Sequence, residues 1–368
     1  MKRRTINATW GLLCLITLTG CWDSQYLTHK KIVNGISLDA ANGNRLLGAV
    51  RAVTLESKGG GQFDVKDEIV HAVGDSTNEV GMKIDNMLPG TLEASKVHVI
   101  IIGEELARKG MLPALESFYR NPKGYLKSNV LIGRGKGFDI LAFKKIENNP
   151  IAFGIKQIFE GSVSKTIVPE QTLYSLWNEM TDPGQDTVMP MIRKMNDKAV
   201  IVDGVGLMSG GHYSGVSLPE EESTLLLLLM GKLGKFAAME TDSDANVVSF
   251  RVVKIKRSMD LSVDDRTSKI ECAINLDLYG FIASDPNSLS EAVDRERIKN
   301  KIAASLNKQA VAVVSKLLQA NCDALGVGRK LSVSRPGLWK KIDWQNGYKD
   351  VALKPNVRIH LTGTGIIS

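Results

Sequence analysis

The sequence predicts a multidomain α+β protein with mostly antiparallel sheets, helices packed against them and a long helix in the C-terminal half. Three observations support this fold class. Strand patterns come in neighbouring pairs joined by turn residues, as at Asn42-Gly43. Helical patterns with three- and four-residue spacing lie between the pairs, which favours sheets covered by helices on one face. At 368 residues the chain also exceeds one ordinary hydrophobic core, so we expect two or three domains.

The first half contains short strand and helix patterns. Alternating or continuous apolar residues predict strands over 32–38, 46–55, 69–73, 97–102 and 130–132. Apolar residues at helical spacing predict helices over 80–88, 104–109, 111–119, 138–145, 151–159 and 171–180. Ser76 and Glu79 form a capping-box pattern ahead of the first of these helices. Gly59-Gly60-Gly61 is typical of a flexible loop.

A segment over 181–190 has the chemistry of a linker, because Pro183-Gly184 and Pro190 interrupt regular patterns. We therefore place the main domain boundary near residue 195. The expected units are an N-terminal domain over 22–195 and a C-terminal α+β domain over 196–368.

The second half predicts longer elements. Strands are expected over 199–207, 247–255, 269–279 and 357–361, with a short strand that ends at Val216 after a turn at 209–211. A helix is expected to begin with Ser217 as its cap, Pro219 in its first turn and acidic residues at 220–222. The longest predicted helix covers about 289–320, with an apolar face formed by Ile298, Ile302, Leu306, Ala310, Val313 and Leu317.

The N-terminus has the pattern of a secretory signal. Lys2-Arg3-Arg4 precedes an apolar run over 10–18, which is shorter than the roughly 20 residues that span a bilayer. Leu18-Thr19-Gly20-Cys21 is typical of a lipobox, in which the Cys receives acyl chains such as palmitate. We expect residues 1–20 to be a signal peptide and Cys21 to carry the lipid. Each buried CH₂ adds roughly 0.8 kcal/mol to membrane affinity. An ordinary signal with a coincidental Cys is the alternative.

The mature chain is mildly basic. Without the three basic residues of the signal, it holds 44 Lys and Arg against 40 Asp and Glu, a net charge of about +4. This charge fits a position near an anionic membrane surface. It is too diffuse to indicate nucleic-acid binding, because no basic cluster with interleaved aromatic residues occurs.

Two cysteines remain in the body of the chain, Cys272 and Cys322. Cys272 lies in a segment, 270–278, whose even positions are apolar and whose odd positions are mostly polar. We expect it to be a small core residue on a strand. The spacing of the two cysteines does not require a disulfide. No second apolar segment reaches 18 residues, so we expect a soluble body.

Familiar catalytic and metal-binding motifs do not occur in the sequence, so we expect no enzyme, no cofactor and no metal. The run Gly133-Arg134-Gly135-Lys136-Gly137 follows a strand and precedes a helix, as a phosphate cradle would. Its spacing matches no known cradle and favours a turn. The Gly204–Gly210 run favours a strand over a dinucleotide site. The Asp242–Asn246 stretch imitates the start of a calcium loop, but Val247 and Val253 stand where such a loop needs Gly and Glu, which favours a polar hairpin turn. We expect His98 to be a core residue rather than a ligand.

Two apolar or charged features leave alternatives open. The run 225–230 is apolar on every helical face, which favours core packing over a docking surface for a membrane partner. The long helix carries basic residues on its polar positions, and these fit either a solvated face or contact with anionic lipid or an acidic partner. The six residues are Arg295, Arg297, Lys299, Lys301, Lys308 and Lys316.

Several segments, in their shared order, resemble the C subunit of bacterial spore germinant receptors, the Ger(x)C lipoprotein family. In the first half they are Cys21-Trp22-Asp23, 33–39, 90–94, 99–110 and 118–122. In the second half they are 206–208, 213–215, 221–225 and 322–328, followed by Trp339 and Trp344. The resemblance covers nearly all of the mature chain.

The resemblance implies a non-enzymatic, lipid-anchored subunit on the outer face of the spore inner membrane. Such receptors combine this subunit with two multi-span membrane subunits, A and B, and nutrients trigger germination through them. The family fold is α+β with three domains, which fits the two halves if the first divides again near residue 145. Cys21 is the functional residue that the resemblance transfers; direct binding of a germinant by this subunit is not implied.

Two other functions remain as alternatives. A lipid-anchored solute-binding protein would capture a small nutrient directly, but it would show two lobes of repeating strand–helix units. A tethered hydrolase would need a carboxylate or metal constellation that the sequence does not display.

Overall fold

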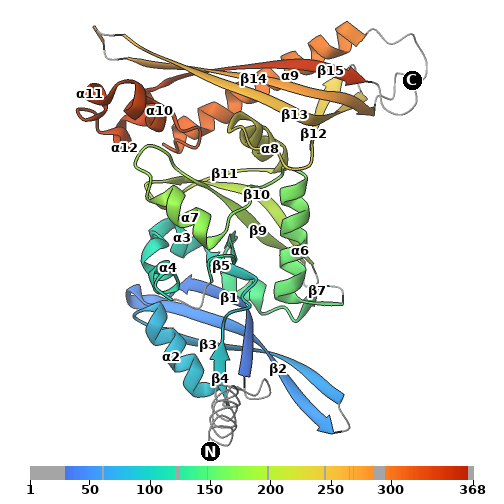
Figure 1. The fold of residues 1–368 in the computed structure, drawn as a ribbon, viewed down its shortest axis with the longest axis vertical. Helices are drawn as coiled ribbons and strands as arrows, with labels where there is room; N and C mark the ends of the chain where they lie inside the picture. The colour runs from blue at the N-terminus through green and yellow to red at the C-terminus, as the bar shows by residue number, and fades with distance from the viewer. Residues whose placement is uncertain are drawn as a thin grey trace, which may run out of the picture.

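The computed structural model describes residues 30–59, 62–121, 125–146, 148–196, 199–243, 246–264, 266–267, 269–284 and 295–363. In Figure 1 a first sheet occupies the lower and middle parts of the molecule and a second sheet crosses its top. The predicted signal peptide, the lipid site at Cys21 and most of the Gly59-Gly60-Gly61 loop lie outside the described residues.

The first sheet has parallel strands at its centre and antiparallel hairpins at its edges. Nine strands of the described chain form it, in the order β11-β10-β9-β6-β5-β1-β2-β3, with β4 beside β1. Their bounds are β1 (Lys30–Ala40), β2 (Leu46–Gly59), β3 (Gln62–Gly74), β4 (Thr91–Glu93), β5 (Val99–Gly103), β6 (Asn129–Gly133), β9 (Val188–Asn196), β10 (Ala199–Ser209) and β11 (His212–Leu218).

The α+β class and the hairpins at 32–55 and 199–216 are confirmed, whereas the parallel centre is a feature that the sequence patterns did not predict. Strands β1, β5, β6 and β9 run parallel to one another, through the pairings β1–β5, β5–β6 and β6–β9. Every residue of β5 and β6 is buried. Burial on both faces explains why these two strands are continuously apolar rather than alternating.

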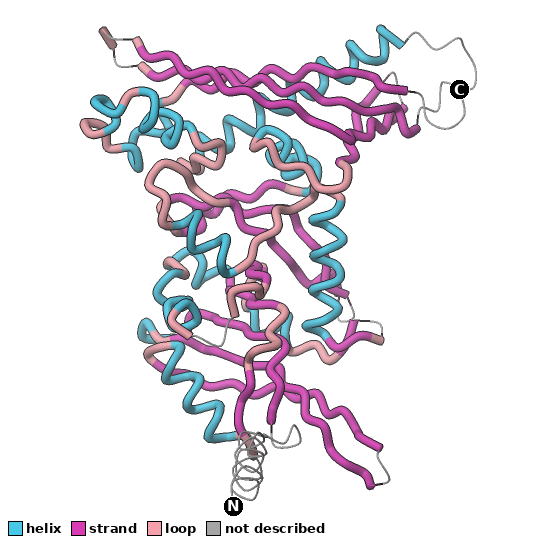
Figure 2. Tube along the Cα trace, viewed as in Figure 1, coloured by secondary structure: helices cyan, strands magenta, loops and turns pink. Residues whose placement is uncertain are grey.

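Helices cover both faces of the first sheet, as Figure 2 shows. The apolar core on one face includes residues of α2 (Thr77–Met87), α3 (Glu104–Lys109), α4 (Leu112–Tyr119) and α7 (Leu173–Met180). The core on the other face includes residues of α5 (Gly137–Leu141), α6 (Ile151–Ser164) and α8 (Glu220–Leu229). The small hairpin β7 (Lys145–Ile146) and β8 (Asn149–Pro150) precedes α6. The predicted cap of α2 is present, because the Ser76 side chain accepts a hydrogen bond from the Glu79 N–H.

The expectation of a linker over 181–190 is wrong for its last three residues, because Val188 begins the buried strand β9. Residues 188–192 are all buried. Proline has no N–H to donate to a neighbouring strand, so Pro190 favoured a loop over a strand in the prediction. In the structure it lies beside a register shift in the pairing with β10, where a missing N–H is tolerated.

The expected domain boundary near residue 195 falls at the turn between β9 and β10, inside the first sheet. Strand β10 pairs with β9, and β11 pairs with β10, so the sheet continues to Leu218. Division of the chain into independent units at 195 therefore stays a prediction.

The second sheet is built from four strands of the described chain, in the order β12-β13-β14-β15. They are β12 (Ala237–Ser243), β13 (Asn246–Val263), β14 (Ile270–Ser284) and β15 (Ala352–Gly363). Helix α9 (Arg295–Gln319) confirms the long helix, and its residues Ile302, Leu306 and Leu317 are buried in the core. The short helices α10 (Val327–Ser334), α11 (Pro336–Trp339), α12 (Trp344–Gly347) and η4 (Tyr348–Asp350) were not predicted.

Helix α8 lies between the two sheets. It begins at Glu220 with Pro219 at its cap position, so the expected start at Ser217 is wrong; that residue belongs to β11. The helix contacts β10 and β11 on one side and α9, β12 and β14 on the other. Leu225 to Leu229 are each at most 1% exposed. The apolar run of this helix therefore packs in the core and is not a docking surface for a membrane partner.

Replacement of Leu228 by alanine tests this role. Leu228 is fully buried, so its loss removes apolar contacts and leaves a cavity between the two sheets. We expect Leu228→Ala to lower the free energy of unfolding by about 2–5 kcal/mol in urea titrations. The matched control is Leu126→Ala, because Leu126 is 39% exposed, and we expect a loss below about 1 kcal/mol. Equal losses in the two variants would contradict the proposed importance of α8.

Candidate functional site

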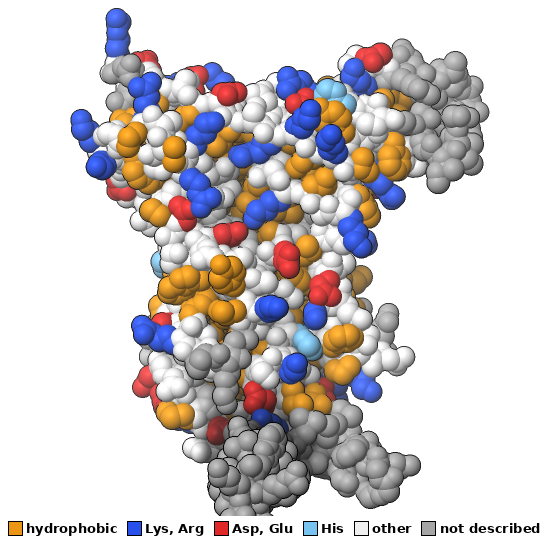
Figure 3. Space-filling view, viewed as in Figure 1, with side chains coloured by type: hydrophobic (Ala, Val, Ile, Leu, Met, Phe, Trp, Pro, Cys, Tyr) orange, Lys and Arg blue, Asp and Glu red, His pale blue; other side chains and the backbone are white. Residues whose placement is uncertain are grey.

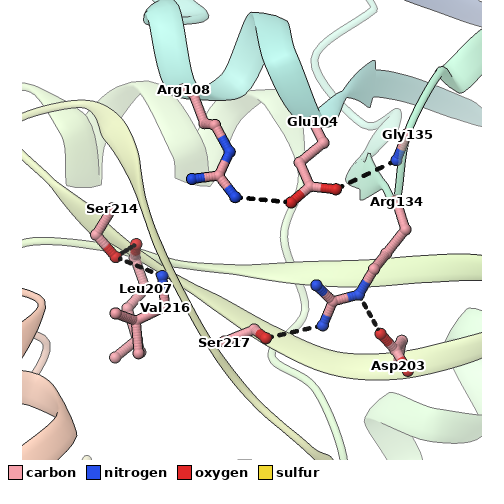
Figure 4. Close-up of polar contacts among 9 residues, drawn as sticks. All are labelled: Glu104, Arg108, Arg134, Gly135, Asp203, Leu207, Ser214, Val216 and Ser217. Carbon is pink, nitrogen blue, oxygen red and sulfur yellow. Dashed lines mark hydrogen bonds and ion pairs between the residues drawn. The ribbon is translucent and has the colours of Figure 1, made fainter.

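The one site residue predicted from the sequence, Cys21, lies outside the described residues. The structure does describe the glycine-rich run Gly133–Gly137, which joins β6 to α5 and was considered as a phosphate cradle. Charged side chains from β1, α3, β9, β10 and the glycine run itself converge here, which makes this region the candidate site. Figure 4 shows its polar contacts.

A buried carboxylate occupies the position where a bound anion would lie. Asp39, at the end of β1, accepts hydrogen bonds from the N–H of Gly137 at 2.6 Å and of Phe138 at 2.8 Å. Its side chain fits because Gly103 is beside it: a Cβ on Gly103 would lie 2.0 Å from Asp39 Oδ1. Burial raises the pKa of Asp39, although the two backbone donors act in the opposite direction.

A second carboxylate closes the other side of the loop. Glu104, at the start of α3, accepts the Gly135 N–H at 3.3 Å and the Arg108 guanidinium at 3.0 Å (Figure 4). Arg108 also lies 4.8 Å above the ring of Tyr213 on β11. A cavity of about 320 Å³ remains beside these groups, lined by both acidic and basic residues.

An arginine on the same loop reaches the opposite hairpin. Arg134 pairs with Asp203 on β10 and donates to the Ser217 hydroxyl on β11 at 2.8 Å. Arg193 on β9 pairs with the other oxygen of Asp203 at 2.8 Å. Figure 4 shows that Ser214 also joins the two strands, because its hydroxyl donates to the Leu207 carbonyl at 2.8 Å.

The contacts of Asp39 and Glu104 with the Gly133–Gly137 run therefore form a joint that holds this loop to β1 and α3. They do not leave an empty phosphate cradle. The N–H groups of Gly135, Gly137 and Phe138 already donate to carboxylates of this chain. A phosphate would have to displace Asp39 and Glu104, whose negative charges oppose its approach. The interpretation of the glycine run as a turn is confirmed.

A second buried carboxylate pair joins the two halves of the molecule. Asp323, after α9, accepts the N–H of Val327 at 2.9 Å, that of Gly328 at 2.7 Å and the Trp344 indole N–H at 3.1 Å. Asp186, before β9, accepts the N–H of Asp323 at 2.9 Å and that of Gly210 at 3.0 Å. Burial raises the pKa of both, that of Asp323 to about 7.

The remaining candidates from the sequence have structural positions. Cys272 and Cys322 are buried and unpaired, and burial raises the pKa of Cys272 to about 11. His98 is half-buried just before β5, with its ring 5.9 Å from that of Phe153. No cluster of metal-ligating side chains occurs within the described residues. The stretch that imitates a calcium loop lies at the β12–β13 hairpin, and its residues 244–245 lie outside the described chain.

The surface in Figure 3 mixes blue and red side chains over most of the visible face. Apolar side chains gather on it beside α4 and α7, where Tyr174 is 62% and Trp177 41% exposed. Within the described residues, no helix is long and apolar enough to cross a membrane.

Comparison with protein families gives two matches along the chain. The family described as spore germination protein N-terminal domain matches residues 23–194. The family described as spore germination B3/GerAC like, C-terminal, matches residues 203–365. The expected boundary near residue 195 lies between these two matches.

Comparison with individual proteins also finds spore germination proteins. The chain is 22% identical to the putative spore germination protein YfkR of Bacillus subtilis (strain 168), over 95% of this chain and 94% of that protein. It is 20% identical to spore germination protein KC of the same strain, over 100% and 97% of the two chains. The crystal structure of the GerBC protein superposes with a TM-score of 0.60 at 17% identity, covering 93% of this chain and all of that one.

Replacement of Asp39 by asparagine tests the joint at the glycine run. The amide keeps one acceptor but turns an NH₂ group toward a backbone N–H, which leaves a buried donor without a partner. We expect Asp39→Asn to lower the free energy of unfolding by about 1–3 kcal/mol. Asp75→Asn, at an exposed position, is the control and should change it by less than about 0.5 kcal/mol. An unchanged stability of Asp39→Asn would contradict the assignment of this joint.

The buried carboxyl group of Asp323, in its contact with Asp186, should make the stability of the protein depend on pH. The pKa of Asp323 is about 7 in the folded chain and about 4 in an unfolded one, so its contribution is lost as the pH rises through this interval. We expect the free energy of unfolding to fall by about 3 kcal/mol between pH 5 and pH 8 through this group. Asp323→Asn, which cannot ionise, should remove that part of the slope. Identical slopes in the two proteins would refute the assignment.

Proposed function

The chain belongs to the GerAC-like family of spore germinant receptor C subunits, and on this basis we propose that it is a lipid-anchored subunit needed for receptor assembly and signalling. The observation that carries the anchor is the lipobox Leu18-Thr19-Gly20-Cys21 behind a basic and apolar signal. Its acyl chains hold the mature protein on the outer face of the spore inner membrane. Its role is to bind and to couple, not to catalyse.

The tether fixes which end of the body is close to the membrane. Nine residues carry the chain from Cys21 to Lys30, where β1 begins. Fully extended, they reach about 30 Å. The end of the molecule with β1, β4 and α2 therefore stays near the lipid, while the second sheet lies at the far end of the long axis (Figure 1).

Its partners are the multi-span A and B subunits of the receptor. A body that transmits a signal between them has to move as a unit, because a loose joint between its parts would absorb the displacement. Two features support such stiffness: α8 connects the first sheet to the second, and the Asp186–Asp323 contact connects the first sheet to the C-terminal helices. A displacement that nutrient recognition causes in one of these subunits then reaches the other through this framework.

Substitution of the lipid site tests the proposal. Spores that lack this chain are complemented with the wild type, Cys21→Ala or the control Cys14→Ala, whose site lies within the signal that is removed. We expect Cys21→Ala protein to leave the membrane fraction and nutrient-triggered dipicolinate release to fall to the level of spores lacking the chain. Cys14→Ala should behave as the wild type. Externally added calcium dipicolinate should still trigger germination in every strain.

Two outcomes would contradict the proposal. If Cys21→Ala protein stays in the membrane fraction and supports a full nutrient response, lipidation is not the anchor. If spores lacking the chain respond normally to every nutrient mixture, the chain is not a required receptor subunit in them.

A further inference from the structure

A cavity of about 450 Å³ lies where the first sheet meets the short C-terminal helices. Its volume is within the range of small-molecule sites, roughly 300–1,000 Å³. One wall comes from residues 180–187 and the turn between β10 and β11. The other wall comes from Asn321 and from residues 339–348 of α11, α12 and η4. The cavity is therefore built jointly by parts of the chain that are more than 100 residues apart in sequence.

The lining combines negative charge with aromatic rings. Three carboxylates face it, those of Asp182, Asp186 and Asp343, and its described lining includes no Lys or Arg. Asp182 is paired with Arg329. Asp186 and Asp343 accept hydrogen bonds from neutral N–H groups, so their charge is not cancelled by these contacts.

The aromatic part consists of Trp339, Trp344 and Tyr348. The two indole rings have their centroids 5.7 Å apart, and the Trp344 and Tyr348 rings lie 5.8 Å apart. Aromatic faces next to carboxylates attract cations, because the negative face of the ring adds to the attraction of the acid.

Two polar atoms of this lining have no partner within the described chain. They are the hydroxyl of Tyr348, whose side chain is 1% exposed, and Oδ1 of Asn321. A buried polar atom without a hydrogen bond is costly. Both atoms have almost no accessible surface, so a molecule in the cavity reaches them only if these side chains shift. The Asn321 oxygen accepts only, and it requires a donor such as N–H or O–H.

We propose that this cavity binds a small organic cation, a primary or quaternary ammonium compound. The ammonium group lies against Asp186 and the indole rings, and the carbon chain packs on Trp339 and Trp344. Because both walls contribute, the bound cation also stabilises the contact between the two halves of the molecule. This inference does not depend on the lipid anchor or on the receptor role.

Calorimetric titration of the full chain, purified in detergent, tests the proposal. The probes are choline and putrescine, each compared with its uncharged counterpart, 3,3-dimethyl-1-butanol and 1,4-butanediol. We expect at least one cation to bind with a millimolar or lower Kd and its neutral counterpart at least tenfold more weakly. Absence of binding by both cations up to about 10 mM, or equal binding by the neutral compounds, would overturn the proposal.

Two variants place the binding in this cavity. Trp339→Leu removes an aromatic face, and Asp186→Asn removes the charge while keeping the shape of the side chain. Each should weaken binding at least tenfold. The controls are Trp177→Leu, on the exposed side of α7, and Asp75→Asn, and both should bind as the wild type does. If Asp186→Asn fails to fold, Trp339→Leu alone decides, and wild-type affinity in that variant would refute the site.

Discussion

The fold depends on one constraint, the five consecutive leucines of α8. A helix with Leu225 to Leu229 has no face that tolerates water, so it is stable only between two apolar layers. Strands β10 and β11 provide one layer, and β12 with α9 provides the other. The two sheets are thereby parts of one packed body, and one continuous core cluster includes residues of both.

Buried carboxylates supply the directional contacts that this apolar packing lacks. Hydrophobic contact holds layers together but does not fix the paths of the loops between them. Asp39 fixes the path into α5, and Asp323 fixes the path into α10, in each case through two backbone N–H groups. Burial of these loops excludes the water that would accept hydrogen bonds from their N–H groups. Each carboxyl group accepts those hydrogen bonds in place of water, whether or not it is ionised. The loops that lead into α5 and α10 therefore follow defined paths.

The sequence was sufficient where the signal is local. The cap of α2 at Ser76, the apolar strand β5 and the buried face of α9 follow from spacing alone. The prediction was wrong where a residue type occurs in two kinds of structure. Pro190 is typical of a loop but lies in β9. The polar joints could not be predicted, because Asp39 meets Gly137 across 98 positions of sequence. Lipidation of Cys21 stays a prediction from the sequence pattern.

The parallel pairing of β14 with β15 has a consequence for how the protein is made. The two strands are separated by the whole of α9 and the short helices, and α9 packs on β15. A chain that emerges N-terminus first can complete the first sheet before β15 is available. Until residues 352–363 appear, the edge of β14 has no neighbour and one apolar side of α9 is uncovered. The upper half of the molecule is thus the last to form, and premature termination near its end would release a chain prone to aggregate.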